Sequence, residues 1–208
     1  MKKTDTPFFF LAPWPLAIAS VILLAISYIY FDRPIAEYFH TSPWQSSPSV
    51  QLFSDFLAPT TQIIGWSVLF FIFRFLFVKK SSNRLWLVSL AVTVGYFAAI
   101  LIKCVLGRYR PELWFEHGHY GFLFFAINEP ELSFPSGHAT VTGAALGAWG
   151  CRHPRLSVPF FLLSIVLSFV RVILGVHYLS DVLAGVILGT FVSQWIYLCM
   201  HKQQIKFS

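Results

Sequence analysis

Long apolar stretches, separated by short polar connections, run through the whole chain. A helix that crosses a bilayer needs about 20 mainly apolar residues, and six stretches reach or approach that length. They cover roughly 12–31, 57–78, 85–107, 138–150, 156–175 and 179–200. Backbone polar groups in lipid must be hydrogen-bonded within their own segment, so each stretch is predicted to be a helix. The pattern predicts an all-α bundle of six transmembrane helices.

The fourth stretch, 138–150, is too short for a full crossing, so we expect its helix to extend upstream or to cross at an angle. It contains Gly143 and Gly147, and the sixth stretch contains Gly185 and Gly189. Small residues four positions apart favour close helix packing in membranes. The general enrichment of glycine in membrane helices explains the same pattern, so both interpretations stay open.

The composition is that of a membrane protein. Hydrophobic residues make up 56% of the 208 residues and charged residues 12%, whereas about 25% of the residues in an ordinary soluble domain are charged. The sequence has no internal repeat and no low-complexity linker, so we expect a single domain over 1–208. The net charge of +6 is dispersed over short loops, which argues against nucleic-acid binding. Nothing in the sequence indicates an obligate protein partner.

The basic residues predict which side of the membrane each loop faces. If both termini lie inside, the inner segments hold nine Lys and Arg residues and the outer loops hold three. The inner residues are Lys2, Lys3, Lys79, Lys80, Arg84, Arg152, Arg155, Lys202 and Lys206, and the outer ones are Arg33, Arg108 and Arg110. This asymmetry fits the positive-inside rule. We therefore expect cytoplasmic termini and an outward-facing loop over 108–134.

That outer loop is rich in aromatic residues. They are Trp114, Phe115, Tyr120, Phe122, Phe124, Phe125 and Phe134. Trp and Tyr favour the headgroup level of a bilayer, so we expect the loop to lie on the membrane surface, and a role in guiding a lipid stays open. The loop also contains His117 and His119. An isolated pair without a third ligand is a weak sign of a metal site, and surface histidines explain it better.

Seven polar side chains map to the outer ends of the last four predicted spans. They are Lys103, Arg110, Ser136, His138, Arg171, His177 and Asp181. Ionisable residues in or near a bilayer are costly and mark functional sites by default. Each one alone has a structural explanation, because Lys and Arg side chains can extend to the interface. Their gathering on one side of the membrane indicates a common site.

The positive charges in this set predict the ligand. Lys103, Arg110 and Arg171 are typical of a site for a multiply charged anion, and phosphate fits best. Ser136 is a candidate cap of the following helix, where free amides near Ser136 and Gly137 would bind the same anion. Mg²⁺ is usually bound through carboxylates and phosphate oxygens, and no cluster of carboxylates accompanies these cations. The sequence therefore predicts phosphate chemistry without a metal or another cofactor.

Two histidines and an acid supply a mechanism. His177 can attack phosphorus as a nucleophile, which splits one hard step into two. Asp181 lies four residues later, so one helical turn can bring its carboxylate to the imidazole, fix the tautomer and stabilise the imidazolium. His138 can protonate the leaving oxygen as a general acid.

Three ordered motifs carry a family resemblance. "KCVLGRYRP" matches K-x6-R-P, "PSGH" at 135–138 matches P-S-G-H, and "RVILGVHYLSD" matches R-x5-H-x3-D. With these motifs, which span 103–181, and its six-span pattern, the chain resembles the type 2 phosphatidic acid phosphatase superfamily. That family includes bacterial membrane lipid phosphatases and soluble vanadium haloperoxidases. One departure is Val170, which stands where the third motif usually has Ser and which bears on substrate preference or rate.

The resemblance implies a role for each matched residue. Phosphate is bound by Lys103, Arg110, Ser136, Gly137 and Arg171, while His138 is the acid, His177 the nucleophile and Asp181 its partner. We therefore expect a metal-independent phosphatase that acts on a membrane lipid through a phosphohistidine, at the periplasmic face of a bacterial inner membrane. The family's substrates include undecaprenyl pyrophosphate, phosphatidylglycerophosphate, phosphatidate and lipid A 1-phosphate, and the sequence does not choose among them.

Three alternatives use the same residues. A vanadate-dependent haloperoxidase would hold vanadate in the pocket, but six spans disfavour a soluble oxidase. A non-catalytic protein that binds or transports a lipid phosphate would keep the anion site, but it would not need His138, His177 and Asp181. A lipid-to-lipid phosphotransferase would pass the phosphoryl group from the same phosphohistidine to a second lipid instead of to water.

Overall fold

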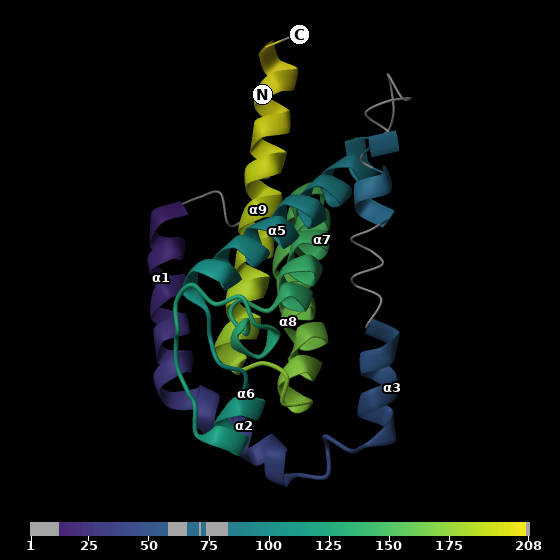
Figure 1. The fold of residues 1–208 in the computed structure, drawn as a ribbon. Coiled ribbons are helices and arrows are strands. Elements are labelled where there is room, and N and C mark those ends of the chain that lie inside the picture. Colours follow the sequence, from purple (N-terminus) through teal and green to yellow (C-terminus); the bar gives the residue numbers. More distant parts are fainter. Residues whose placement is uncertain (1–12, 58–65, 71, 74–82, 207–208) are drawn as a thin grey trace.

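The computed structural model describes residues 13–57, 66–70, 72–73 and 83–206, and nearly all of their regular structure is helical, as the sequence predicts (Figure 1). The α-helices are α1 (Pro13–Ile26), α2 (Asp32–Thr41), α3 (Pro48–Leu57), α5 (Asn83–Leu106), α6 (Pro111–His117), α7 (Gly137–Arg152), α8 (Ser157–Ile173) and α9 (Leu179–Lys206). Shorter π or 3-10 turns are η2 (Ser27–Phe31), η3 (Glu129–Glu131) and η4 (Pro154–Leu156). Two isolated bridges join Arg108 to Phe122 and Leu132.

Four helical segments of the described chain are long and apolar enough to cross a membrane. They are Pro15–Thr41, Leu85–Leu106, Pro154–Ile173 and Leu179–Met200, which confirms the first, third, fifth and sixth predicted spans as helices of membrane length. The fourth predicted span is the 16-residue α7, which begins at Gly137, only one residue upstream of the predicted start, so a crossing at an angle stays a prediction. Most of the second, 57–78, lies outside the described residues, and the count of six spans stays a prediction.

Two glycines and a capping serine mark the ends of three helices near the candidate site. α5 stops before Gly107, which has a left-handed φ of +49°, and α8 is followed by Gly175 with a φ of +68°. Glycine adopts such angles without the steric cost that a Cβ brings. α7 starts where Ser136, in an extended conformation, caps the helix with its side chain. These breaks place the ends of three helices next to one another.

α7 and α9 pack backbone against backbone. A Cβ on Gly143 would lie 2.6 Å from Val186 O, and one on Gly189 would lie 2.1 Å from Thr140 O. Both distances are far below van der Waals contact, so glycine is required at each position. The close-packing interpretation of the glycine spacing is therefore confirmed.

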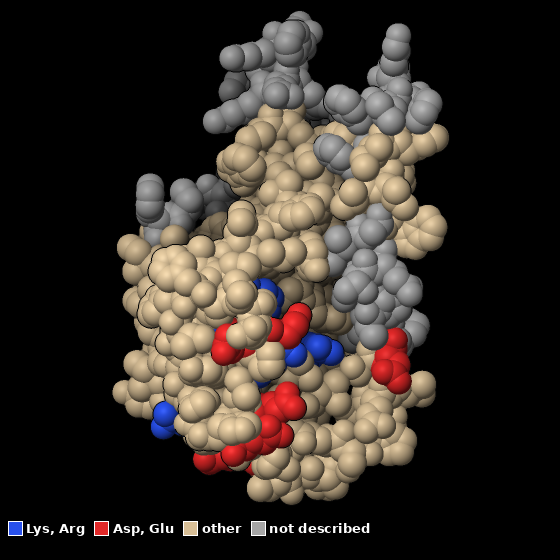
Figure 2. All heavy atoms as spheres, in the orientation of Figure 1, with Lys and Arg blue, Asp and Glu red and all other residues tan. Residues whose placement is uncertain are grey.

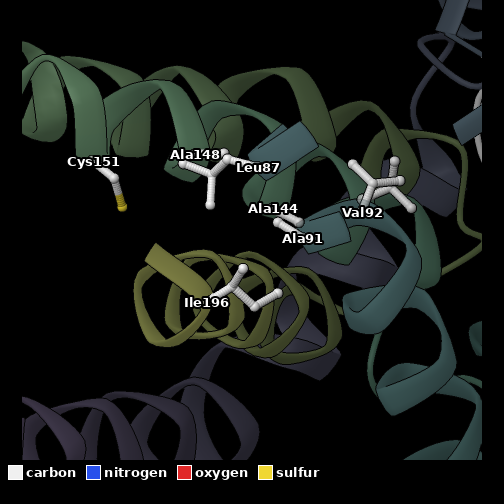
Figure 3. Packing of buried hydrophobic residues seen from close by; sticks show 8 residues of the cluster. Leu87, Ala91, Val92, Ala144, Ala148, Cys151 and Ile196 are labelled. Atoms are coloured by element: carbon white, nitrogen blue, oxygen red, sulfur yellow. The ribbon is translucent and has the colours of Figure 1, made fainter. Parts of the chain in front are cut away.

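The core joins α5, α7 and α9 through small and medium apolar side chains (Figure 3). Its buried members are Leu87, Ala91, Val92, Val141, Ala144, Ala148, Cys151 and Ile196. α9 also contacts α1 and α8, and it lies in the middle of the bundle (Figure 1). The side chains at the ends of these helices are thus held on a closely packed scaffold.

We expect Gly189→Ala to destabilise the protein, because its methyl group would collide with the backbone of α7. Overpacking of this kind costs about 1–3 kcal/mol, so the midpoint of thermal unfolding in detergent should fall. Gly95→Ala in α5 is the matched control, since its Cβ would meet its nearest neighbours at an ordinary 3.5 Å. Equal midpoints for the two variants would contradict the close approach of α7 and α9.

Candidate active site

The ends of α5, α7, α8 and α9 converge at the end of the bundle that carries α2 and α6 (Figure 1). Lys103 lies in the last turn of α5, Arg171 lies in the last turn of α8, and Arg110 lies directly before α6. Ser136, Gly137 and His138 lie at the start of α7. His177 lies just before α9, and Asp181 lies in its first turn. Figure 2 shows Lys and Arg atoms set between Asp and Glu atoms on this part of the surface. All the predicted site residues therefore lie in one region.

The three predicted phosphate-binding cations are close enough for their charges to act on one another. Lys103 interacts with both Arg110 and Arg171, and the two arginines interact with each other. Lys103 also donates a hydrogen bond to Leu132 O, and Arg110 pairs with Glu129 (Nη2–Oε2 2.6 Å). The Nε atoms of both arginines are buried and have no hydrogen-bond partner among the described residues. A bound phosphate would relieve the repulsion and accept from these donors.

The start of α7 adds backbone donors to these cations. Ser136 is the N-cap, as predicted: its Oγ accepts a hydrogen bond from an N–H of the first turn at 3.5 Å. Its own N–H is occupied, because it donates to Asp181 O at 3.0 Å. The next two N–H groups, of Gly137 and His138, have no acceptor within the described structure and are available to an anion. A Cβ on Gly137 would lie 4.0 Å from Lys103 Cε, so the start of α7 lies next to this lysine.

His177 lies buried at the start of α9, with 5% of the residue exposed. Burial lowers the pKa of His177 to about 4; Asp181 opposes this shift, and Lys103 and Arg110 add to it. The imidazole is therefore neutral at physiological pH, which is the form that a nucleophile needs. His138, the predicted acid, is partly buried within electrostatic reach of Arg171.

Ser133 joins His177 to Asp181, which the sequence had predicted to meet directly. Asp181 Oδ2 is 3.7 Å from His177 Nδ1, beyond hydrogen-bond length. Ser133 Oγ lies 3.3 Å from Nδ1 and 2.6 Å from Oδ2. A serine hydroxyl can accept from Nδ1–H while it donates to a carboxylate, and this arrangement leaves Nε2 without a proton. Sequence reasoning missed Ser133, because it stands outside the three motifs.

Arg108, which the loop charges placed in the outer loop beside Arg110 as a second residue that could take part in the chemistry, is also part of this region. Its side chain is fully buried, and its guanidinium pairs with Asp32 (Nη2–Oδ2 2.7 Å) and with Asp181. Asp32 was missed as well. A carboxylate directly after the first apolar stretch was the available signal, since such a group near a bilayer needs a cationic partner.

A polar cleft of about 290 Å³ opens beside Arg110. Its other polar side chains are His40, Gln45, Glu112 and Glu116. The ring of His40 stacks on Phe115 with the centroids 3.8 Å apart. Hydroxyl groups can both donate to the carboxylates and accept from the amide and imidazole groups, so the lining of the cleft suits a hydroxylated group.

An apolar rim lies in the loop before α7. Leu123, Phe124, Phe125 and Ile127 are all exposed, and the exposed fractions of Phe125 and Ile127 reach 82% and 84%. Ala126 between them is buried, but exposed apolar side chains this close together mark contact with a membrane or another partner. This arrangement agrees with the expectation that the loop lies on the membrane surface.

The two loop histidines do not form part of a metal centre in the described structure. Among the described residues, no three His, Cys, Asp or Glu side chains are placed to hold a metal ion together. The rings of His117 and His119 lie 6.0 Å apart, and His117 Nδ1 is 3.8 Å from Glu116 Oε2. Metal independence of the reaction stays a prediction that rests on the gathered cations.

Two solved structures share the fold. The structure of Aquifex aeolicus LpxE superimposes with a TM-score of 0.56 at 20% identity, over 83% of this chain and 98% of that one. A transmembrane PAP2-type phosphatidylglycerolphosphate phosphatase from Bacillus subtilis gives a TM-score of 0.57 at 18% identity, over 92% of this chain and 96% of that one. The chain therefore shares its helical architecture with these two proteins.

Sequence relatives point to the same group. A lipid A 1-phosphatase from Rhizobium johnstonii is 40% identical over 95 residues, which are 46% of this chain and 39% of that protein. A decaprenylphosphoryl-5-phosphoribose phosphatase from Mycobacterium tuberculosis is 37% identical over 130 residues, which are 62% of this chain and 68% of that protein. The chain thus matches less than half the length of the Rhizobium enzyme. The family model of the PAP2 superfamily matches residues 84–205, a segment that contains all three motifs, and the chain belongs to this superfamily.

Proposed function

We propose that the protein is a lipid phosphatase in which His177 attacks phosphorus and becomes a phosphohistidine. The observation that carries the proposal is a buried, neutral His177 within reach of the cations Lys103 and Arg110, with Asp181 close to its Nδ1. Membership of the PAP2 superfamily supports it, as do relatives that are named as lipid phosphatases.

In the first step the phosphoryl group moves from the lipid to the enzyme. Lys103, Arg110, Arg171 and the N–H groups at the start of α7 hold the non-bridging oxygens and stabilise their charge. His177 Nε2 forms a bond to phosphorus as the bond to the lipid oxygen breaks. His138 gives its proton to that oxygen, so the lipid leaves as a neutral alcohol or, from a diphosphate, as a monophosphate.

In the second step water regenerates the enzyme. His138, now unprotonated, accepts a proton from the attacking water, and the bond between phosphorus and Nε2 of His177 breaks. Inorganic phosphate leaves. Throughout, Asp181 acts on the ring through Ser133: it keeps the ring proton on Nδ1 and stabilises the positive charge on the phosphorylated ring.

The substrate that we propose to test first is a lipid-linked sugar phosphate, such as lipid A 1-phosphate. Relatives are named as lipid A 1-phosphatases and as a decaprenylphosphoryl-5-phosphoribose phosphatase. The polar cleft beside Arg110 supports this choice, because its amide, imidazole and carboxylate groups suit sugar hydroxyls. Undecaprenyl pyrophosphate, phosphatidylglycerophosphate and phosphatidate are the comparison substrates.

We also propose that the site faces the periplasm, with cytoplasmic termini. The distribution of Lys and Arg over the loops supports this orientation. The exposed apolar rim at Leu123–Ile127 would then rest on the outer leaflet of the inner membrane, beside the entrance for a lipid phosphate.

Purified protein should release inorganic phosphate from at least one of these four lipids. His177→Ala should lower the rate by at least about a thousandfold, the order of loss when a nucleophile is removed. His119→Ala, at an exposed loop position, is the control and should keep wild-type activity. If the wild type is inactive on every lipid, or if His177→Ala stays active while folded, the proposed function fails.

Phosphate release should persist in excess EDTA, because cations from the chain itself neutralise the phosphate oxygens. The check is a rate measurement with and without the chelator and with added Mg²⁺. Complete loss of activity in EDTA, restored by Mg²⁺, would show that a metal supplies the charge that we assign to Lys103, Arg110 and Arg171.

The orientation predicts that a cysteine at His119 reacts with a membrane-impermeant reagent in intact spheroplasts. In a background without Cys104, Cys151 and Cys199, His119→Cys should be labelled before lysis. His153→Cys, in the exposed turn between α7 and α8, is the matched control and should be labelled only after lysis. The reverse order of labelling would overturn the periplasmic orientation.

A further inference from the structure

The most deeply buried charges of the described structure form a chain behind His177. Arg108, Asp32 and Asp181 all have 0% exposed side chains. Nη2 of Arg108 lies 2.7 Å from Asp32 Oδ2, and Nη1 pairs with Asp181 Oδ1 and also donates to Ser180 Oγ at 2.7 Å. Buried charges persist only where they are paired in this way.

Aromatic rings close off the guanidinium from water. The Arg108 Cζ atom lies 4.4 Å from the ring centroid of Tyr178, 4.9 Å from that of Tyr28 and 5.4 Å from that of Phe122. Electrostatic interactions are much stronger in such a water-poor environment than at a surface. A change of one charge within the chain should therefore be felt at His177.

Asp32 belongs to the first membrane-length helix and lies outside the segment that the family model matches. It reaches the site from there: its Oδ1 accepts a hydrogen bond from Ser180 N at 2.8 Å, in the first turn of α9. Asp32 thus ties α2 to the turn that holds Asp181. Asp32 is not one of the motif residues to which a role in phosphate binding or catalysis is assigned.

The net charge of Asp32, Arg108 and Asp181 together determines how these residues act on His177. Arg108 is one cation between two carboxylates, so the group of three carries a net charge of −1. If Arg108 had Asp181 as its only partner, the pair would be neutral, and Arg108 would offset more of the negative charge that Asp181 presents to the ring of His177. Without Arg108, a buried Asp181 would be driven toward its protonated form.

We propose that Asp32 and Arg108 are positioning residues for the phosphoryl transfer at His177. Arg108 holds Asp181 ionised and aimed at Ser133, and Asp32 balances Arg108 so that the charge of Asp181 remains available to His177. This inference rests on the proposed function, because it concerns the same nucleophile.

The other charges near His177 set the direction of the expected change. α9 contributes Asp181, α5 contributes Lys103, and the segment before α6 contributes Arg110. Further away, Arg171 of α8 acts on His138 of α7. Asp32→Asn removes one negative charge from a region that already holds these cations. It should therefore make the protonated form of His177 less favourable.

Asp32→Asn should lower kcat about tenfold to a hundredfold, by analogy with the loss when an outer partner of a metal-bound histidine is removed, while KM changes little. The acid limb of the kcat/KM profile, which reports the free enzyme, should move to lower pH. Asp32→Glu, which keeps the charge, should keep the limb in place. Glu37→Gln is the matched control, because it removes an exposed carboxylate from the same helix.

The direction of the pH shift separates this role from simple loosening of the fold. Water entering a loosened site would raise the pKa of His177 toward its ordinary value and would move the acid limb to higher pH. An upward shift, or an Asp32→Asn variant with wild-type kcat and an unmoved limb, would overturn the proposal. If Asp32→Asn does not fold, Arg108→Lys replaces it: one ammonium cannot span both carboxylates, so full kcat in that variant would also overturn the proposal.

The two proposals fail in different ways. An inactive wild type would refute the phosphatase function. In that case NMR titration of the His177 imidazole, compared between wild type and Asp32→Asn in detergent, still tests the charge linkage. A lower pKa in the variant supports it, and an equal or higher pKa refutes it.

Discussion

Close backbone contact between α7 and α9 is the constraint on which the candidate site depends. Gly143 and Gly189 allow this contact, because a Cβ on either residue would lie within 2.6 Å of a carbonyl oxygen of the other helix. A hydrogen bond from Ser136 N to Asp181 O then joins the starts of the two helices. The amide groups at the start of α7 and the carboxylate of Asp181 in α9 are thereby fixed relative to each other. His177, four residues before Asp181, is held by the same contact.

Groups of opposite charge surround the neutral imidazole of His177. On the Nδ1 side of His177, Ser133 and Asp181 connect to the buried pair of Arg108 and Asp32. Other elements bring lysine and arginine side chains into reach of the same ring. Burial keeps the imidazole neutral. In the reaction that we propose, the anionic group behind the ring stabilises the positive charge that a bond to phosphorus creates.

The sequence predicts those features of the fold that depend on residues close together in the chain. Apolar length gave four of the spans, the Ser136 cap followed from its place before an apolar helix, and the glycine spacing indicated close packing. The sequence could not show that Ser133 lies between His177 and Asp181, because this contact depends on how the loop before α7 folds against the start of α9. The pairing of Asp32 with Arg108, distant in sequence, is a tertiary contact of the same kind. The second span and the orientation are still predictions.

Trapping of the phosphorylated enzyme tests most directly whether His177 is the nucleophile. Protein mixed with a lipid phosphate labelled with ³²P and quenched in alkali should retain label in an acid-labile, base-stable bond, and peptide mass spectrometry should locate the phosphoryl group on His177. Turnover of the lipid without label on the protein, or label on a residue other than His177, would contradict the account.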